Sequence, residues 1–275
     1  MTLATIERSP SQTASEGGQQ APLLRVSNLS KWYGHVVGCR DVSFELRPGE
    51  VLGIVGESGS GKTTLLNSIS GRLPPTSGVV EFETSRFGLT DIYALNEPDR
   101  RRMQREDWGF VHQNPRDGLR MRVSGGANVA EPLMNLGNRH YGQMRRATLE
   151  WLDRVELDTS RIDDKPRNFS GGMQQRIQVA RNLIHGPRLV FMDEPTGGLD
   201  VSVQARLLDL LRELVRDLGL AVIIVTHDMA VARLMADRLI VMKSGYIVET
   251  GLTDQVLDDP QHPYSQLLVS SVLQI

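Results

Sequence analysis

Apolar runs of strand length recur along the chain and alternate with amphipathic segments. Two of them, "RLVFMD" at 188–193 and "LAVIIVT" at 220–226, are almost uninterrupted, which is typical of strands buried on both faces. Three further predicted strands lie nearer the N-terminus: "LLRVSN" at 23–28, "DVSFEL" at 41–46 and "VLGIVG" at 51–56. A Pro-Gly pair between the last two predicts a turn.

The segments between these strands have helical periodicity. In "SVQARLLDLLRELVRDL" at 202–218, five leucines fall on one helical face: Leu207, Leu210, Leu211, Leu214 and Leu218. Helices are also predicted from Lys62, over the charged stretch 97–106, and through most of 127–185. Strands that alternate with helices indicate an α/β fold with a mostly parallel sheet covered by helices on both faces.

The same pattern predicts the domain organisation. We expect one domain over residues 22–275, with a helical subdomain at about 115–185 inserted in the α/β core. Residues 1–21, rich in Ser, Thr, Gln and Gly, are expected to form a disordered tail. The longest strongly apolar uncharged run, 218–226, is too short to span a bilayer. We therefore expect no direct membrane insertion.

Charge and cysteine content narrow the class of protein. A formal charge of −2 gives no general attraction to nucleic acid, and "DRRRMQR" at 99–105 is interpreted as a solvated helix face. We therefore expect no nucleic-acid partner. Cys39 is the only cysteine, so one chain cannot build a disulfide framework or an iron–sulfur cluster. A reducing, cytoplasmic location follows. Only four lysines occur against 27 arginines, which makes the place of each lysine informative.

One of those lysines lies in a glycine-rich turn between a buried strand and a helix start. Residues 56–63, "GESGSGKT", fit the pattern G-x-x-x-x-G-K-[ST]. Glycines let successive backbone N–H groups point at phosphate oxygens, and the helix start adds its positive end. Lys62 would contact the β and γ phosphates, and the Thr63 hydroxyl would ligate Mg²⁺. The sequence therefore predicts a nucleotide site.

Two carboxylates end the buried strand "LVFMDE" at 189–194. The carboxyl end of a parallel strand lies at the same sheet edge as the phosphate loop. Asp193 is then placed to hold Mg²⁺ through water, and Glu194 to orient and polarise the attacking water.

A second candidate anion site is "SGGMQ" at 170–174, where Ser170 is a good helix N-cap.

These motifs, in this order, resemble those of ABC-type ATPases from about Leu23 to the C-terminus. The resemblance implies a RecA-like, mostly parallel sheet core with an antiparallel β edge and an inserted helical subdomain. It also implies a role for each matching residue. The nucleotide-binding set is Tyr33, Gly56, Glu57, Ser58, Gly59, Ser60, Gly61, Lys62, Thr63 and Thr64; the catalytic set is Lys62, Gln113, Glu194 and His227; the Mg²⁺ ligands are Thr63, Gln113 and Asp193.

Members of this family bind ATP between two cassettes arranged head to tail. The resemblance implies that Ser170, Gly171, Gly172 and Gln174 form the signature that contacts the ATP of a second cassette, identical or related. Asp200 matches the D-loop, and Tyr33 matches the aromatic that stacks on adenine. Gln113 matches the glutamine that couples the site to a partner. The implied cofactors are ATP and Mg²⁺.

Catalytic motifs define the reaction but leave the client open. The stretches "VAEPL" and "QHPYSQLL" are similar to those of oligopeptide- and nickel-importer ATPases. Taken whole, the sequence most resembles the K-type ABC subunits of bacterial carbon–phosphorus lyase, above all in "VHQNPRDGLRMRVSGGANVAE". That resemblance implies docking on soluble carbon–phosphorus lyase core subunits during phosphonate breakdown. An ATPase that acts on ribosomes or DNA ranks last, because the chain has one cassette and no basic domain.

The stretch from Arg116 to Gly126 distinguishes the lyase resemblance from the importer one. By analogy with the family's Q-loop region, it would press on the partner protein. Arg116, Arg120 and Arg122 are therefore candidates for protein contact.

Overall fold

The computed structural model describes residues 21–84 and 86–272. The predicted disordered tail, residues 1–21, lies outside the described part except for its last residue.

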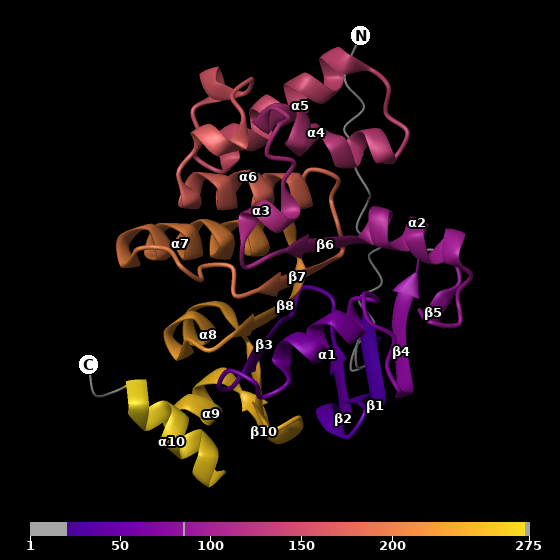
Figure 1. The fold of residues 1–275 in the computed structure, drawn as a ribbon, viewed down its shortest axis with the longest axis vertical. Coiled ribbons are helices and arrows are strands. Elements are labelled where there is room, and N and C mark those ends of the chain that lie inside the picture. Colours follow the sequence, from indigo (N-terminus) through magenta and orange to yellow (C-terminus); the bar gives the residue numbers. More distant parts are fainter. Residues whose placement is uncertain (1–20, 85, 273–275) are drawn as a thin grey trace, which may run out of the picture.

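A six-stranded sheet runs through the middle of the molecule (Figure 1). Its strand order is β10-β9-β3-β8-β7-β6, and every neighbouring pair is parallel except β9 with β10. The strands are β3 (Val51–Val55), β6 (Trp108–Val111), β7 (Leu189–Asp193), β8 (Ala221–Thr226), β9 (Arg238–Lys243) and β10 (Tyr246–Leu252). The predicted, mostly parallel core is confirmed.

A second sheet of four antiparallel strands packs beside the first. Its order is β2-β1-β4-β5. The strands are β1 (Leu24–Tyr33), β2 (Val36–Leu46), β4 (Ser77–Thr84) and β5 (Gly88–Asp91). The strands predicted at 23–28 and 41–46 are parts of the longer β1 and β2, and the expected antiparallel edge is confirmed.

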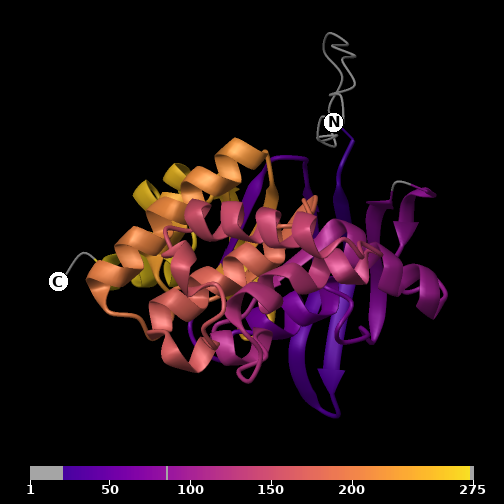
Figure 2. The same cartoon turned by 90° about the horizontal axis from the view of Figure 1, so that it is seen from above.

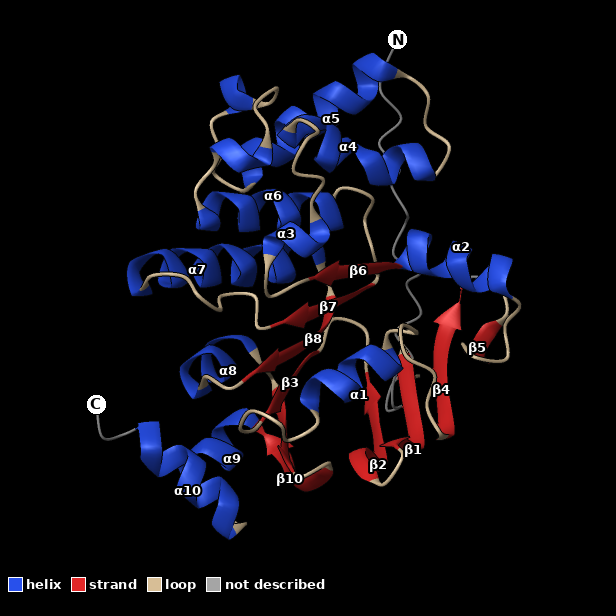
Figure 3. Ribbon diagram, viewed as in Figure 1, coloured by secondary structure: helices blue, strands red, loops and turns tan. Residues whose placement is uncertain are grey.

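Helices cover the sheet and extend beyond it (Figure 3). They are α1 (Lys62–Ile69), α2 (Glu97–Asp107), α3 (Pro115–Gly118), α4 (Gly125–Asn135), α5 (Tyr141–Arg154), α6 (Gly171–Leu183), α7 (Val201–Leu218), α8 (Met229–Met235), α9 (Thr253–Asp258) and α10 (Pro263–Val272), with 3-10 turns at Thr159–Arg161 and Pro166–Asn168. Helices α3 to α6 gather at one end, and α9 and α10 lie at the other. Seen from above, the indigo strands β1 and β2 and the yellow C-terminal helices lie on opposite sides (Figure 2).

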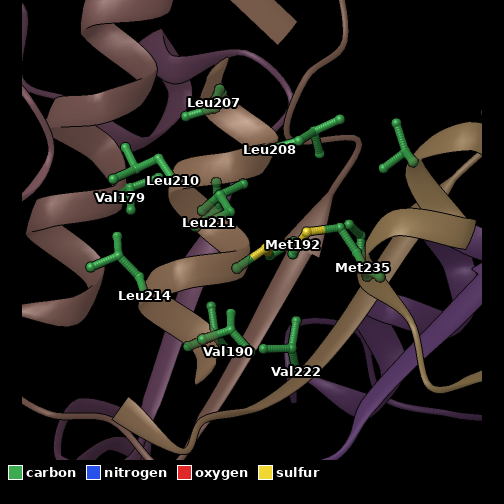
Figure 4. Packing of buried hydrophobic residues seen from close by; sticks show 14 of the residues in the cluster. Val179, Val190, Met192, Leu207, Leu208, Leu210, Leu211, Leu214, Val222 and Met235 are labelled. Atoms are coloured by element: carbon green, nitrogen blue, oxygen red, sulfur yellow. The ribbon is translucent and has the colours of Figure 1, made fainter. Parts of the chain in front are cut away.

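The six-stranded sheet separates two hydrophobic cores because successive strand residues point to opposite faces. On β7, Val190 and Met192 belong to the core under α7, whereas Leu189 and Phe191 belong to the core shared with the antiparallel sheet. Figure 4 shows the α7 leucines against Val190 and Met192. Four of the five predicted α7 leucines are buried. Leu218 is 38% exposed, since the helix ends there at a left-handed Gly219.

Within the described ranges, no helix combines the length and the hydropathy needed to cross a bilayer.

Candidate active site

The phosphate loop connects the buried strand β3 to α1. Gly56 has a φ of 151°, and a Cβ there would lie 2.3 Å from the carbonyl oxygen of Met242, so only glycine fits. The Lys62 ammonium donates to the carbonyl oxygens of Gly56 at 2.7 Å and Glu57 at 2.9 Å. The loop therefore curls around the end of the lysine side chain.

The start of α1 is open to an anion. Gly61 is its N-cap in a left-handed conformation and provides no side-chain cap, so the first N–H groups of the helix have no capping partner from it. Burial lowers the pKa of the Lys62 ammonium, and nearby carboxylates act in the opposite direction. Glu57, Ser58, Gly59 and Thr63 are exposed, Thr64 is half-buried and Ser60 is buried. Residues 56–64, which are the predicted nucleotide-binding residues other than Tyr33, thus form one continuous stretch around the Lys62 ammonium.

Three neighbouring strand ends bring the predicted catalytic side chains together. Gln113 follows β6, Glu194 follows β7 and His227 follows β8, and these strands are adjacent in the sheet. One carboxylate oxygen of Glu194 lies 3.1 Å from Gln113 Nε2, and the other lies 3.0 Å from His227 Nδ1. The glutamate is therefore bracketed on both sides, which fixes the direction of its carboxylate.

The backbone at this point is also constrained. Glu194 has a φ of 42°, a region that residues other than glycine rarely adopt. Its N–H donates to Val225 O at 2.9 Å, and its carbonyl accepts from Gly197 N at 2.8 Å. These two bonds hold an otherwise unfavourable conformation, as is common at functional sites.

The residues around Glu194 fit a divalent cation shared with a substrate. Burial, followed by the charge of Glu194, raises the pKa of Asp193, while Lys62 and Arg72 act oppositely. Two adjacent carboxylates in a half-buried place favour a bound cation. Among the described residues, no group of three or more His, Cys, Asp or Glu side chains could hold a metal by itself. Mg²⁺ commonly takes one or two protein ligands together with substrate phosphates and water, and Asp193, Thr63 and Gln113 fit that role.

The predicted adenine-stacking residue lies next to the phosphate loop. Tyr33 ends β1, and the residue is 49% exposed. Gly38 separates this ring from the loop helix: a Cβ at Gly38 would lie 2.9 Å from Tyr33 Cε2 and 2.7 Å from Thr64 Cγ2. An exposed aromatic face beside the phosphate loop is suited to stacking against a flat base.

The signature stretch caps α6. The Ser170 hydroxyl accepts from Met173 N at 3.4 Å, and Ser170 and Gly171 are exposed while Gly172 is buried. Gln174 is buried, and its amide donates to Phe169 O at 2.9 Å. Asp200, the N-cap of α7, is exposed. Of the predicted signature residues, Ser170 and Gly171 therefore present their polar groups to the surface, whereas the Gln174 amide is engaged within the fold.

The three candidate partner-contact arginines have different surroundings. Arg116 lines a surface hollow of about 500 Å³ together with Gln113, Gly171 and Gln174. Arg120 forms an ion pair with Glu131 at 2.7 Å. Arg122 is exposed. The three arginines are close in sequence, but Arg116 shares its hollow with the signature whereas Arg120 pairs with Glu131 of α4.

The segment 119–126 is packed rather than free. Asn128, fully buried, accepts from Arg120 N at 2.7 Å and donates to the carbonyl oxygens of Arg120, Val123 and Ser124. Gly126 is buried in the first turn of α4, where a Cβ would lie 2.4 Å from Ile162 Cγ1. The glycine pair allows close approach of α4 to residues 162–164.

Two contacts of this site have no signal in the sequence. The hydroxyl of Tyr264 on α10 accepts from the phosphate-loop N–H of Glu57 at 3.1 Å. The buried Gln178 on α6 accepts from His112 N at 2.6 Å and donates to His112 O at 3.1 Å, directly before Gln113. Both contacts join residues at least 66 positions apart, so no local pattern indicates them.

Comparison with known proteins gives a consistent result. The family profile described as "ABC transporter" matches residues 39–197. The chain is 65% identical over 253 residues to the putative phosphonates utilization ATP-binding protein PhnK of Escherichia coli, and the match covers 92% of this chain and 98% of that protein. It is 36% identical to the dipeptide transport ATP-binding protein DppF of the same organism, over 94% of this chain and 79% of that protein.

Solved structures agree with the fold. The ATP-binding cassette MJ0796, in a dimeric post-hydrolysis state bound to ADP and Pi, matches with a TM-score of 0.74 and 30% identity, covering 84% of this chain and 98% of that one. The phosphate loop, the bracketed glutamate and the capped signature helix lie in the fold that this likeness describes. The chain therefore belongs to the ABC transporter family of ATP-binding cassettes and is an ABC ATPase.

Proposed function

We propose that this ABC ATPase hydrolyses Mg-ATP as the ATPase subunit of a carbon–phosphorus lyase complex that degrades phosphonates. The observation that carries the proposal is the 65% identity to a phosphonates utilization protein over almost its whole length, against 36% to a dipeptide transport protein. The stretch 116–126, which resembles the lyase subunits more than the importer ATPases, supports the same client.

The bracketed glutamate supports the proposed chemistry. Gln113 and His227 hold the Glu194 carboxylate so that it accepts a proton from water as that water attacks the γ-phosphorus of ATP. The bond from the γ-phosphorus to its bridging oxygen breaks, and ADP and phosphate leave. Lys62 holds the β and γ phosphates throughout. Mg²⁺, held by Asp193, Thr63 and Gln113, would neutralise the charge that develops on the phosphate oxygens.

A second cassette completes the proposed site. In the described residues, no hydrogen bond joins the signature stretch 170–172 to the phosphate loop of the same chain. Ser170, Gly171 and Asp200 are exposed and available to another chain. We therefore expect a head-to-tail dimer with an identical or related cassette. MJ0796, a cassette of similar fold, forms a dimer bound to ADP and Pi.

The proposed client is the soluble lyase core, in the cytoplasm. Arg120 and Arg122 are exposed on the segment 119–126, whose backbone Asn128 holds by four hydrogen bonds. A segment ordered in this way loses less conformational entropy on binding a protein than a mobile loop does. The alternative is an importer ATPase that docks on membrane permeases, which the 36% identity to a dipeptide transport protein favours.

Affinity purification distinguishes these clients. Tagged wild-type chain is recovered from cells starved of phosphate and fed a phosphonate, with a Lys62→Ala chain as the nucleotide-binding control and the tag alone as background. Co-purification of soluble lyase subunits is the expected result. Recovery of integral membrane permeases without lyase subunits would replace the proposed client by the importer alternative.

A further inference from the structure

A tyrosine from the C-terminal helix reaches the phosphate loop. Tyr264 is the second residue of α10, and its side chain is only 4% exposed. Its hydroxyl oxygen lies 3.1 Å from the backbone nitrogen of Glu57, which donates to it. Figure 1 shows α10 beside α9 and β10. In the sequence, α10 lies more than 200 residues after β3, the strand that leads into the phosphate loop. The C-terminal segment is therefore tied directly to the loop that curls around Lys62.

The peptide unit that donates to Tyr264 also bonds to Lys62. The unit that joins Gly56 to Glu57 has its N–H directed to Tyr264 and its C=O directed to the Lys62 ammonium, 2.7 Å away. Since a peptide unit is planar, fixing the N–H on one side fixes the C=O on the other. Gly56 has a φ of 151°, which favours glycine, and it has no side chain that would resist reorientation of this peptide unit.

Tyr264 is itself held by neighbouring strands. The Lys243 ammonium lies 4.6 Å from the centroid of its ring. The backbone N–H of Tyr264 donates to His262 Nδ1 at 3.0 Å. Glu249 of β10 accepts from the backbone nitrogens of Gln261 at 2.8 Å and His262 at 3.0 Å. The hydroxyl is thus presented to the loop from a segment that is anchored independently of the loop.

We propose that Tyr264 is a positioning residue for nucleotide binding: its hydroxyl orients the peptide between Gly56 and Glu57, which in turn places Lys62 for the phosphates of ATP. The inference rests on ATP binding as part of the proposed function. Without this contact, the peptide between Gly56 and Glu57 samples other orientations. Part of the binding free energy of ATP is then used to order the loop, and the affinity falls. Tyr264 acts before chemistry, because it contacts neither Glu194 nor the bracket around it in the described structure.

The test is the Kd for ATP of Tyr264→Phe, measured by isothermal titration calorimetry, together with KM and kcat. Phenylalanine keeps the ring and its contact with Lys243 and removes only the hydroxyl. Loss of one neutral hydrogen bond predicts a rise in Kd and KM of about threefold to tenfold. kcat at saturation changes by less than about twofold. Tyr141→Phe, an exposed tyrosine on α5, is the matched control and leaves all three values unchanged.

A second variant weakens the hydrogen bonds that hold the segment next to Tyr264. Glu249→Gln weakens the anchoring of residues 261–262 without touching Tyr264, and a rise in the Kd for ATP smaller than that of Tyr264→Phe is expected. A wild-type Kd in both variants would overturn the proposal, as would a fall in kcat at unchanged Kd. Wild-type chain that binds ATP but does not recover lyase subunits would contradict the proposed client alone and leave this result intact.

Discussion

Two loops of this protein combine glycine with basic residues, and their backbones behave in opposite ways. In the phosphate loop, residues 56–62, the helix N-cap is a glycine without a side-chain cap, and the lysine bonds to loop carbonyls. In the segment 119–126, Asn128 binds four backbone groups and the glycines pack against residues 162–164. The first loop leaves the start of α1 without a side-chain cap, whereas the second has its backbone polar groups bonded by Asn128. Composition alone does not distinguish a binding loop from a packed connector.

The largest expected effect concerns the chemistry next to the phosphate loop. Glu194→Gln should lower kcat by about 10²–10⁴, since it removes the proton acceptor that Gln113 and His227 hold. ATP binding should remain, and the dimer should be trapped with ATP, as size-exclusion chromatography would detect. Glu150→Gln, at an exposed position of α5, is the control. Unchanged turnover in Glu194→Gln would remove the catalytic assignment.

The next effect separates binding from stability in the phosphate loop. Lys62→Ala should raise the Kd for ATP by about 10²-fold, because charge-assisted hydrogen bonds to phosphate are lost. The free energy of unfolding should change little, because removing the buried ammonium relieves its desolvation cost while it loses the two hydrogen bonds to Gly56 O and Glu57 O. Calorimetric titration with ATP and urea unfolding measure the two quantities, with the exposed Lys165→Ala as control. A large loss of stability at wild-type affinity would make Lys62 structural.

Asn128→Ala should give the converse result in the packed segment. It leaves backbone groups of residues 120–124 without their partner, and it should lower the free energy of unfolding by about 2 kcal/mol. The Kd for ATP should be unchanged. Asn135→Ala, at an exposed position of the same helix, controls for the loss of an asparagine. If Asn128→Ala weakens ATP binding without destabilising the fold, the segment belongs to the nucleotide site instead.

The smallest effect concerns the client. Combined Arg120→Ala and Arg122→Ala should weaken binding to the lyase core by about threefold to tenfold, in the range of exposed charge contacts, with basal ATPase activity unchanged. Arg212→Ala with Arg216→Ala removes the same charge from α7. Affinity for purified lyase core is measured by biolayer interferometry at two salt concentrations. An equal loss of affinity and basal activity would contradict a contact role.

The fold and much of the candidate site could be predicted because they depend on local patterns. Apolar runs predicted three of the parallel strands, β3, β7 and β8, and the carboxyl end of β7 placed Glu194 near the phosphate loop. The leucines that the sequence placed on one face of α7 are buried except Leu218, which lies at the end of the helix before Gly219. Gln113 and His227 required the family resemblance, because strand order is not visible in one sequence.

The contacts that could not be predicted are polar, single and distant in sequence. Tyr264 reaches Glu57 across 207 positions, and Gln178 reaches His112 across 66. In the sequence, Asn128 has no feature that distinguishes it from other helical residues. In the structure it bonds to backbone groups of the preceding segment, residues 120–124. Such side chains have no periodicity, and their partners are backbone groups that every residue possesses. Only the packed structure shows which backbone groups they satisfy.

The central claim is that the phosphate loop binds ATP whereas the segment 119–126 stabilises the fold. Thermal unfolding with and without Mg-ATP tests this claim most directly, with all variants made in a Glu194→Gln protein so that ATP is not hydrolysed. A ligand that binds only the folded state stabilises it by RT ln(1 + L/Kd), where L is the ligand concentration, so the rise in unfolding temperature grows with the ratio of L to Kd. Asn128→Ala should unfold at a lower temperature than the background protein but keep the full upward shift with Mg-ATP. Lys62→Ala should start near the background temperature and lose that shift. Equal shifts in both variants, or loss of the shift in Asn128→Ala alone, would contradict the account.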